Sequence, residues 1–203
     1  MAKTDFDVIL FDLGGVLIDL VGIPRMVEWT RGRFTVEQLW EKWLLSEAGR
    51  QFESGRIPLE QFAAMMVEEF GLPITPDEFG KSFYYWITGP FPGVKELLGQ
   101  LAQSHRLASL SNTNEMHWRR MREEMGLVQC FHRSFPSHET GFVKPDREAF
   151  EHVIRELGCA PARILYFDDS PLNVRAARAL GISGHRTAGM GDVTRILGEL
   201  GLI

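Results

Sequence analysis

The sequence has 203 residues, of which 44% are hydrophobic and 24% are charged, and its formal net charge is −5 at pH 7. This length and composition indicate one globular protein with a sizeable core and room for a small second domain. The acidic balance and the lack of a basic run disfavour nucleic acid and anionic membrane surfaces as partners. The N-terminal segment has too few consecutive apolar residues for a signal peptide or a membrane span.

The sequence contains two cysteines, Cys130 and Cys159, which are too few for a disulfide framework. We therefore expect two unpaired thiols and a cytoplasmic location. The six histidines show no His-x-x-x-His spacing, so the sequence does not predict a zinc site. No sequence feature indicates an oligomeric state.

Three short segments are apolar throughout and end at polar residues. They are residues 8–11, 107–110 and 164–167, followed by Asp12, by Ser111 and Asn112, and by Asp168 and Asp169. Continuous apolar runs suit strands that are covered on both faces, as in a parallel sheet. Because the carboxyl ends of parallel strands share one edge of the sheet, we expect these polar residues to converge there.

Helical periodicity lies between these predicted strands. Residues 94–101 and 150–157 carry apolar side chains at i, i+3, i+4 and i+7, which predicts one apolar face on each helix. Ser170 and Pro171 predict the cap and the first position of a third helix, which Gly181 would end. The sequence therefore predicts an α/β fold, a Rossmann-like, doubly wound parallel sheet.

Residues 20–88 interrupt this alternation. They hold 12 of the 22 aromatic residues and four of the five tryptophans, and their apolar residues have helical spacing. We expect a helical cap domain at 20–88 and a core domain formed by 1–19 and 89–203. Most of these aromatic side chains should form the core of the cap, while Trp43, Phe52 and the segment 53–56 are candidates to reach the site.

Four segments carry a family resemblance: Phe11–Leu17 (FDLGGVL), Leu110–Asn114 (LSNTN), Gly141–Pro145 (GFVKP) and Phe167–Asn173 (FDDSPLN). Their residues, order and spacing resemble those of the haloacid dehalogenase-like (HAD) superfamily, over essentially the whole chain. Within it, they look most like the bacterial glucose-1-phosphate phosphatase subgroup. The resemblance implies a Mg²⁺-dependent phosphatase that acts on a small organic phosphate through an aspartyl-phosphate.

The resemblance also implies a metal site. Asp12 and Asp169 would bind Mg²⁺ directly, together with the backbone carbonyl of Gly14. Asp168 would assist through water or through a lysine, and Asn173 would brace the loop. Carboxylates that converge in one crevice repel one another unless a hard cation such as Mg²⁺ bridges them, so the metal is physically reasonable.

The remaining implied roles concern the phosphate group. Asp12 would be the nucleophile, and Lys144 would offset the repulsion between its carboxylate and the phosphate dianion. The hydroxyl of Ser111 and the backbone amide of Asn112 would bind phosphate oxygens together with Lys144.

The first motif departs from most family phosphatases at Gly14, where a second aspartate usually protonates the leaving alcohol. The proton would then come from water or a substitute such as His117, which lies one helical turn beyond Asn114. Three functions stay open: a phosphatase, a metal-independent haloacid dehalogenase, and a non-catalytic protein that binds phosphate esters. The phosphatase is the preferred hypothesis, with a sugar phosphate such as glucose 1-phosphate as substrate.

Overall fold

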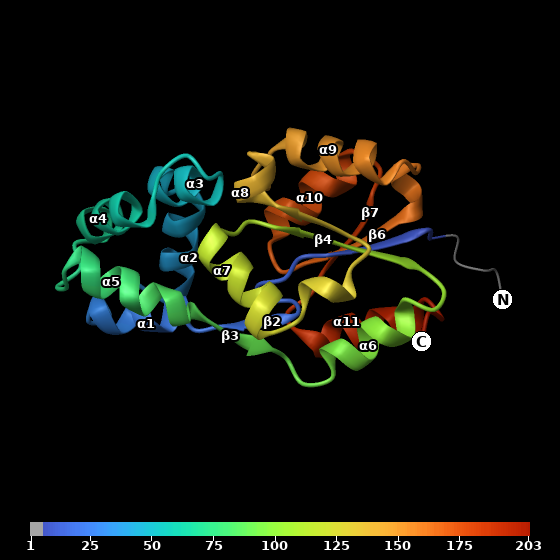
Figure 1. The fold of residues 1–203 in the computed structure, drawn as a ribbon, viewed down its shortest axis with the longest axis horizontal. Helices are drawn as coiled ribbons and strands as arrows, with labels where there is room; N and C mark the ends of the chain where they lie inside the picture. Colours follow the sequence, from blue (N-terminus) through green and yellow to red (C-terminus); the bar gives the residue numbers. More distant parts are fainter. Residues whose placement is uncertain (1–5) are drawn as a thin grey trace.

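The computed structural model describes residues 6–203, and its core is a five-stranded parallel sheet in the order β5-β4-β1-β6-β7 (Figure 1). The strands are β1 (Val8–Phe11), β4 (Arg106–Ser111), β5 (Arg133–Pro136), β6 (Ile164–Asp168) and β7 (Ser183–Arg186). The three strands predicted from apolar runs are confirmed and occupy the centre of the sheet. The outer strands β5 and β7 were not predicted, because RSFP and SGHR have no apolar run.

Helices cover both faces of this sheet. Ile9 and Phe11 of β1 pack among residues of α6 (Val94–Leu101) and α11 (Met190–Glu199), whereas Val8 and Leu10 pack among residues of α9 (Arg147–Leu157) and α10 (Pro171–Ala179). Alternate residues of a strand point to opposite faces, so each central strand contributes to two hydrophobic clusters. The α/β architecture predicted from the sequence is confirmed.

Short helical segments complete the core. α7 (Glu115–Arg119) continues into a π-helical turn at Arg120–Glu124, and α8 (Ser137–Thr140) directly follows β5. Short 3-10 turns lie at Val128–Cys130 and Pro161–Arg163. α10 begins at Pro171 with Ser170 at the N-cap position, as expected. The Ser170 side chain makes no capping bond, and the Ser170 backbone N–H donates to the carboxylate of Asp168.

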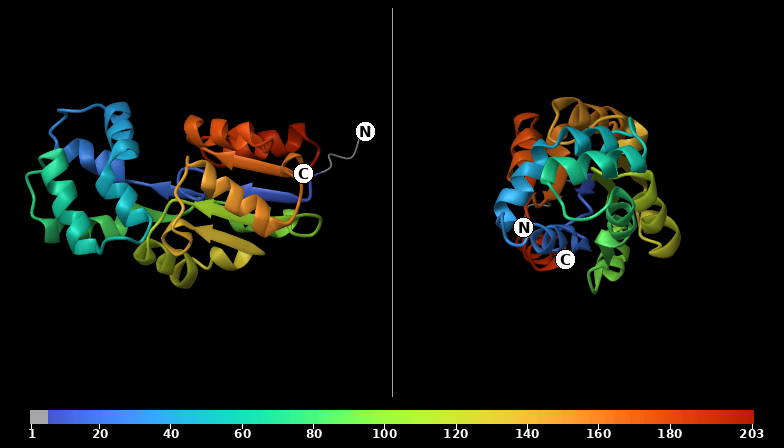
Figure 2. Two further views of the ribbon diagram at one scale, coloured as in Figure 1. Left: turned by 90° about the horizontal axis from the view of Figure 1, so that it is seen from above. Right: turned by 90° about the vertical axis from the view of Figure 1, so that its left-hand side faces the viewer.

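In the sequence, five helices follow β1 and precede the remaining elements of the core. Their apolar residues form a separate hydrophobic cluster. The five helices are α1 (Gly22–Trp29), α2 (Val36–Leu45), α3 (Glu47–Glu53), α4 (Leu59–Phe70) and α5 (Pro76–Phe83). Aromatic rings fill this cluster: the rings of Phe52 and Phe62 stack with centroids 4.3 Å apart. Figure 2 shows these helices as a lobe beyond the carboxyl ends of the parallel strands. We call this lobe the cap.

A two-stranded antiparallel ribbon joins the cap to the core. It consists of β2 (Ile18–Leu20) and β3 (Ile87–Pro90), and β3 follows a 3-10 turn at Tyr84–Trp86. Gly22 packs so closely on the indole of Trp86 that a Cβ on it would lie 2.2 Å from the ring. The chain therefore enters and leaves the cap at one place, through this ribbon.

Two further expectations concern the chain as a whole. Cys130 and Cys159 are both unpaired. None of the helices formed by residues 6–203 combines the length and the hydropathy that spanning a lipid bilayer requires.

Candidate active site

A buried lysine joins two carboxylates at the carboxyl ends of the central strands. The Lys144 Nζ atom lies 2.9 Å from Asp12 Oδ1 and donates a 2.8 Å hydrogen bond to Asp168 Oδ2. Asp12 directly follows β1, and Asp168 is the last residue of the neighbouring β6. The parallel register therefore brings Asp12 and Asp168 together, and Lys144 reaches both from the loop before α9.

Asp168 is fully buried, and four groups donate hydrogen bonds to its two oxygens. Besides Lys144, they are the Tyr166 hydroxyl, the Ser170 backbone N–H at 2.8 Å and the Asn173 side-chain amide at 3.0 and 3.1 Å. Both oxygens of the Asp168 carboxylate are therefore used to position Lys144 and the segment 170–173 that follows β6. This geometry is in keeping with an indirect role for Asp168 and a bracing role for Asn173. Sequence analysis did not single out Tyr166, since it resembles the apolar residues around it in β6.

Asp169 lies beside the tight turn that follows β1. Gly15 has φ +73°, and a Cβ on it would lie 2.5 Å from Asp169 Oδ2. Glycine is required here both for the left-handed backbone and for the close approach of the carboxylate. The glycine pair after Asp12 therefore makes room for Asp169 next to the nucleophile candidate.

The charges in this cluster perturb one another. Burial raises the pKa of Asp12 well above its usual range, although Lys144 opposes the shift, and burial with repulsion from Asp168 raises the pKa of Asp169 to about 6. Burial would lower the pKa of Lys144, but attraction to Asp12 and Asp168 outweighs it and raises the pKa. One lysine cannot neutralise three carboxylates, so the cluster retains excess negative charge.

The donor set suits a hard divalent cation. Asp12, Asp168 and Asp169 each offer an oxygen, and these oxygens lie within 4.8 Å of one another. The buried atoms Ser170 Oγ and Asn173 Oδ1 beside them have no hydrogen-bond partner within residues 6–203. Oxygen donors and uncompensated negative charge are what Mg²⁺ requires, and its retained waters would supply partners for such atoms.

The loop after β4 faces this cluster. Ser111 is buried at the end of β4, and the Asn112 side chain joins its loop to the lysine loop in both directions. Its Nδ2 donates to the Lys144 carbonyl at 3.0 Å, and its Oδ1 accepts from the Lys144 N–H at 2.8 Å. Asn112 therefore fixes the position of Lys144 relative to Ser111, which sequence analysis did not anticipate.

A cavity of about 560 Å³ separates this cluster from the cap. Its core side is lined by polar residues, which include Asp12, Gly14, Ser111, Asn112, Lys144, Asp169 and Asn173. The cap side is largely apolar, and α2 contributes Trp40 and Leu44. Both are exposed, at 37% and 45%, whereas Leu39 of the same helix is buried in the cap core. Helix α2 thus has two apolar faces, one for packing and one for the cavity.

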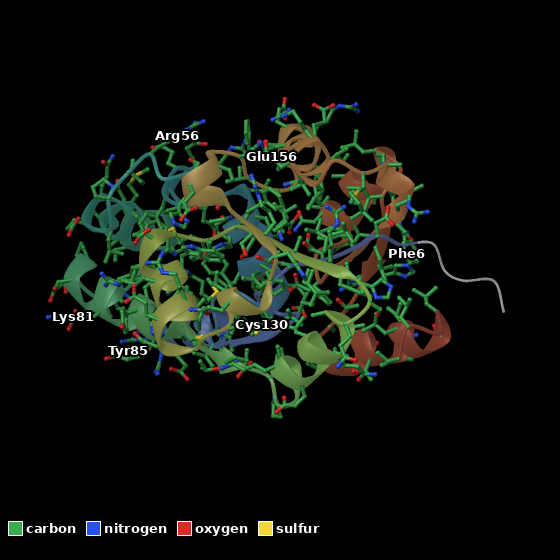
Figure 3. The ribbon with its side chains drawn as sticks, turned by 45° about the vertical axis from the view of Figure 1, so that its right-hand side comes forward. Phe6, Arg56, Lys81, Tyr85, Cys130 and Glu156 are labelled. Atoms are coloured by element: carbon green, nitrogen blue, oxygen red, sulfur yellow. The ribbon has the colours of Figure 1, made fainter. Side chains whose placement is uncertain are left out.

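Two of the cap candidates reach the cavity. Trp43 and Glu53 both line it. Phe52 is buried in the cap cluster, and Arg56 is exposed and points outward (Figure 3). Burial raises the pKa of Glu53 to about 7, against the effects of Trp43 and Lys144. Sequence analysis included Glu53 in a candidate segment but carried no signal that distinguished it from its neighbours.

His117 borders the cavity, but both of its ring nitrogens are engaged. Nε2 lies 2.8 Å from the Phe83 carbonyl, and Nδ1 lies 3.2 Å from the Asn114 side-chain amide. A carbonyl only accepts, so the Nε2 atom carries the proton and Nδ1 accepts. Burial lowers the pKa of His117 to about 4, so the ring is neutral at pH 7. This geometry does not support His117 as the substitute proton donor.

The fold, the three strand-end segments and the Lys144 loop define a class of enzyme. The model of the haloacid dehalogenase-like hydrolase family matches residues 6–181. The chain belongs to this family of hydrolases, and its expected fold class is confirmed by the solved structures that resemble it.

Similar proteins of known activity include phosphatases and a dehalogenase. A sesquiterpene phosphatase of Aspergillus oryzae is 29% identical over 185 residues, which cover 89% of each chain. A D-ribitol-5-phosphate phosphatase of Bacteroides thetaiotaomicron is 22% identical and covers 85% of this chain and 87% of its own. An (S)-2-haloacid dehalogenase of Xanthobacter autotrophicus is 26% identical and covers 89% of this chain and 74% of its own.

Among solved structures, a HAD-family enzyme from Bacteroides thetaiotaomicron in complex with magnesium and inorganic phosphate has a TM-score of 0.72. It is 27% identical, and the match covers 91% of this chain and 96% of that one. The resemblance to the wider family is confirmed, while the glucose-1-phosphate phosphatase subgroup stays a prediction.

Replacing the buried lysine should destabilise the fold. Lys144→Met leaves Asp12 and Asp168 buried without their cation, and breaking such a buried pair costs about 3 kcal/mol. Urea denaturation at pH 7 without divalent cations measures the free energy of unfolding. Lys95→Met, at an exposed position of α6, is the control. A change below about 0.5 kcal/mol in Lys144→Met would contradict the assigned role of this pair.

The raised pKa of Glu53 predicts a pH-dependent stability. Between pH 4.5 and about 7 the unfolded chain releases a proton that the folded chain retains, so the free energy of unfolding should fall as pH rises. Glu53→Gln should remove about 1–2 kcal/mol of this decline, since the side chain is partly exposed to the cavity. Denaturation in chelator at pH 4.5 and 8 measures it, with Glu47→Gln on the same helix as control. Parallel declines in all three proteins would refute the assignment.

Proposed function

We propose that this chain is a Mg²⁺-dependent phosphatase that hydrolyses a small organic phosphate monoester through an aspartyl-phosphate on Asp12. The observation that carries the proposal is the Asp12–Lys144–Asp168 arrangement, in which a buried ammonium lies 2.9 Å from one oxygen of the nucleophile candidate. The phosphatases among its relatives support the same activity. The two unpaired cysteines are compatible with the cytoplasmic location we expect.

In the proposed reaction, the free oxygen of Asp12 attacks phosphorus while Oδ1 is held by the Leu13 N–H at 2.7 Å and by Lys144. The bond between phosphorus and the ester oxygen breaks, and its electron pair leaves with the alcohol. Ser111, the Asn112 amide and Lys144 bind the phosphate oxygens. Water then attacks phosphorus, which releases phosphate and restores Asp12.

Asp12, Asp169 and the Gly14 carbonyl would hold Mg²⁺ in this proposal, with Asp168 positioning Lys144. When bound, the cation neutralises charge that develops on the transferring phosphoryl group. The magnesium and phosphate in the related solved structure support this assignment.

The two other functions fit the site less well. A metal-independent dehalogenase has no use for the clustered carboxylates and the unpartnered atoms beside them, and no arginine follows the nucleophile closely. A non-catalytic protein that binds phosphate esters needs no buried nucleophile. The metal requirement separates the first alternative from a phosphatase, and turnover separates the second.

The lining of the cavity favours an ester of an apolar alcohol, such as an aryl or terpenoid alcohol. A sugar presents hydroxyls, which need polar partners, but the cap side carries Trp40, Trp43, Leu44 and Trp86. The charged residues Glu37, Glu41 and Arg50 also line the cap side, and all three are exposed to solvent. The sesquiterpene phosphatase among the relatives supports this substrate class. A sugar phosphate, predicted from the subgroup resemblance, is the second candidate, and the D-ribitol-5-phosphate phosphatase supports it.

Asp12→Asn should abolish turnover, with a loss of at least about 10⁴-fold, because an amide cannot form the acyl-phosphate. The natural chain should also lose activity in chelator and regain it with Mg²⁺. Phosphate release from 4-nitrophenyl phosphate measures both effects. Full activity in chelator would favour the dehalogenase, which chloride release from 2-chloropropionate would then reveal.

The apolar lining predicts substrate preference. Benzyl phosphate should be hydrolysed with a kcat/KM about tenfold or more above that of glucose 1-phosphate, and Trp40→Ala should lower the value for benzyl phosphate about tenfold through lost apolar contact. Tyr85→Ala is the control, because Tyr85 is 66% exposed and lies outside the cavity lining. A higher kcat/KM for glucose 1-phosphate in the natural chain would instead support the sugar phosphate.

A further inference from the structure

The cavity lacks an acid at the position where the first motif usually supplies one. Leu20 occupies the space beside Gly14, and a Cβ on Gly14 would lie 3.1 Å from Leu20 Cδ1. Leu20 itself lines the cavity. The wall next to the nucleophile is therefore apolar, and the group that protonates the leaving alcohol has to come from another element.

Glu53 approaches the same cavity from the cap. It is the last residue of α3, and together with Asp12, Ser111 and Lys144 it lines the space above the strand ends. The charge of Lys144 acts on the Glu53 carboxyl, whereas Arg50, one turn earlier on α3, is paired with Asp146 on the core. The Glu53 carboxyl is thus turned towards the site rather than paired at the surface.

The end of α3 is fixed to the loop that carries the phosphate-binding candidates. The Ser137 hydroxyl donates to the Glu53 carbonyl and accepts the Thr113 N–H at 2.9 Å. Next to it, a Cβ on Gly55 would lie 2.7 Å from the His138 carbonyl, so the two backbones are in close contact. These contacts hold Glu53 at one position relative to Ser111 and Asn112, the two residues that precede Thr113.

On the basis of the proposed phosphatase function, we propose that Glu53 is the general acid and base that replaces the carboxylate missing at Gly14. Asp12 bonds to phosphorus, the ester P–O bond breaks, and the Glu53 carboxylic acid gives its proton to the departing oxygen. In the second half, the Glu53 carboxylate takes a proton from water as its oxygen attacks phosphorus. The Asp12–phosphorus bond breaks with its electron pair returning to Asp12, and Glu53 is protonated again.

The environment of Glu53 suits both halves of this cycle. The pKa of about 7 keeps comparable amounts of acid and carboxylate present at neutral pH, which is the condition for efficient proton transfer in either direction. Trp43 lines the same cavity and favours the charged form of the Glu53 carboxyl, and its indole N–H can only donate, so it does not accept the proton that Glu53 delivers.

The test compares two aromatic esters of similar size with different leaving groups. Enzyme in excess is mixed with 4-nitrophenyl phosphate or with benzyl phosphate, and alcohol release in the first turnover is followed by rapid quench. 4-Nitrophenol is a far stronger acid than benzyl alcohol, so its oxygen departs without help. Glu53→Gln should slow release of benzyl alcohol about 100-fold and that of 4-nitrophenol by less than about threefold. Glu47→Gln, exposed on the same helix, is the control.

A second variant distinguishes the loss of the carboxyl group from a change in folding or packing. Glu53→Ala opens space in which formate can act, so added formate should restore release of benzyl alcohol and leave release of 4-nitrophenol unchanged. Equal losses on both esters, no loss on either, or a lack of rescue would overturn the assignment of Glu53 alone. If the natural chain releases neither alcohol, the proposed phosphatase function fails, and the assignment fails with it.

Discussion

The neutralisation of buried negative charge at the end of a parallel sheet is the constraint on which the rest of this structure depends. Three aspartates meet there because adjacent parallel strands end at one edge, and their mutual repulsion has to be offset at a largely buried position. Lys144 offsets part of this repulsion. Asp168 accepts hydrogen bonds from Lys144 and Tyr166, and Asn112 accepts the backbone N–H of Lys144 and so fixes the position of the lysine loop. The charge that remains is a reason for a divalent cation to bind.

The sequence predicted those elements whose own residues match their surroundings in the fold, such as apolar strands at the buried centre of the sheet. The three central strands are continuous apolar runs, so both their existence and their polar ends could be predicted. The edge strands β5 and β7 could not, because their pairing is imposed by neighbours rather than by their own residues. At α10, Ser170 and Pro171 predicted the start of the helix correctly, because both signals are local to the chain.

At the site, the residues in the strand-end motifs could be anticipated, but those supplied by the cap could not. Glu53 and Arg56 are three residues apart and equally polar, yet one lines the cavity and the other is exposed to solvent. What separates them is the direction in which the chain leaves α3, and this direction depends on contacts with Ser137 and His138, more than 80 residues further along the sequence. Short-range periodicity contains no information about such contacts.

The ribbon of β2 and β3 gives the cap a single attachment through two adjacent backbone passes. Moving α2 and α3 away from the sheet would break the contacts of Glu53 with Ser137 and of Arg50 with Asp146, but it would leave every strand pair of the core intact. A ligand bound across the cavity would contact both lobes, with its anionic end at the sheet and its organic end at the cap. In the proposed reaction the phosphoryl group stays on Asp12 at the sheet, so the organic product, in contact with the cap, would be the first to leave.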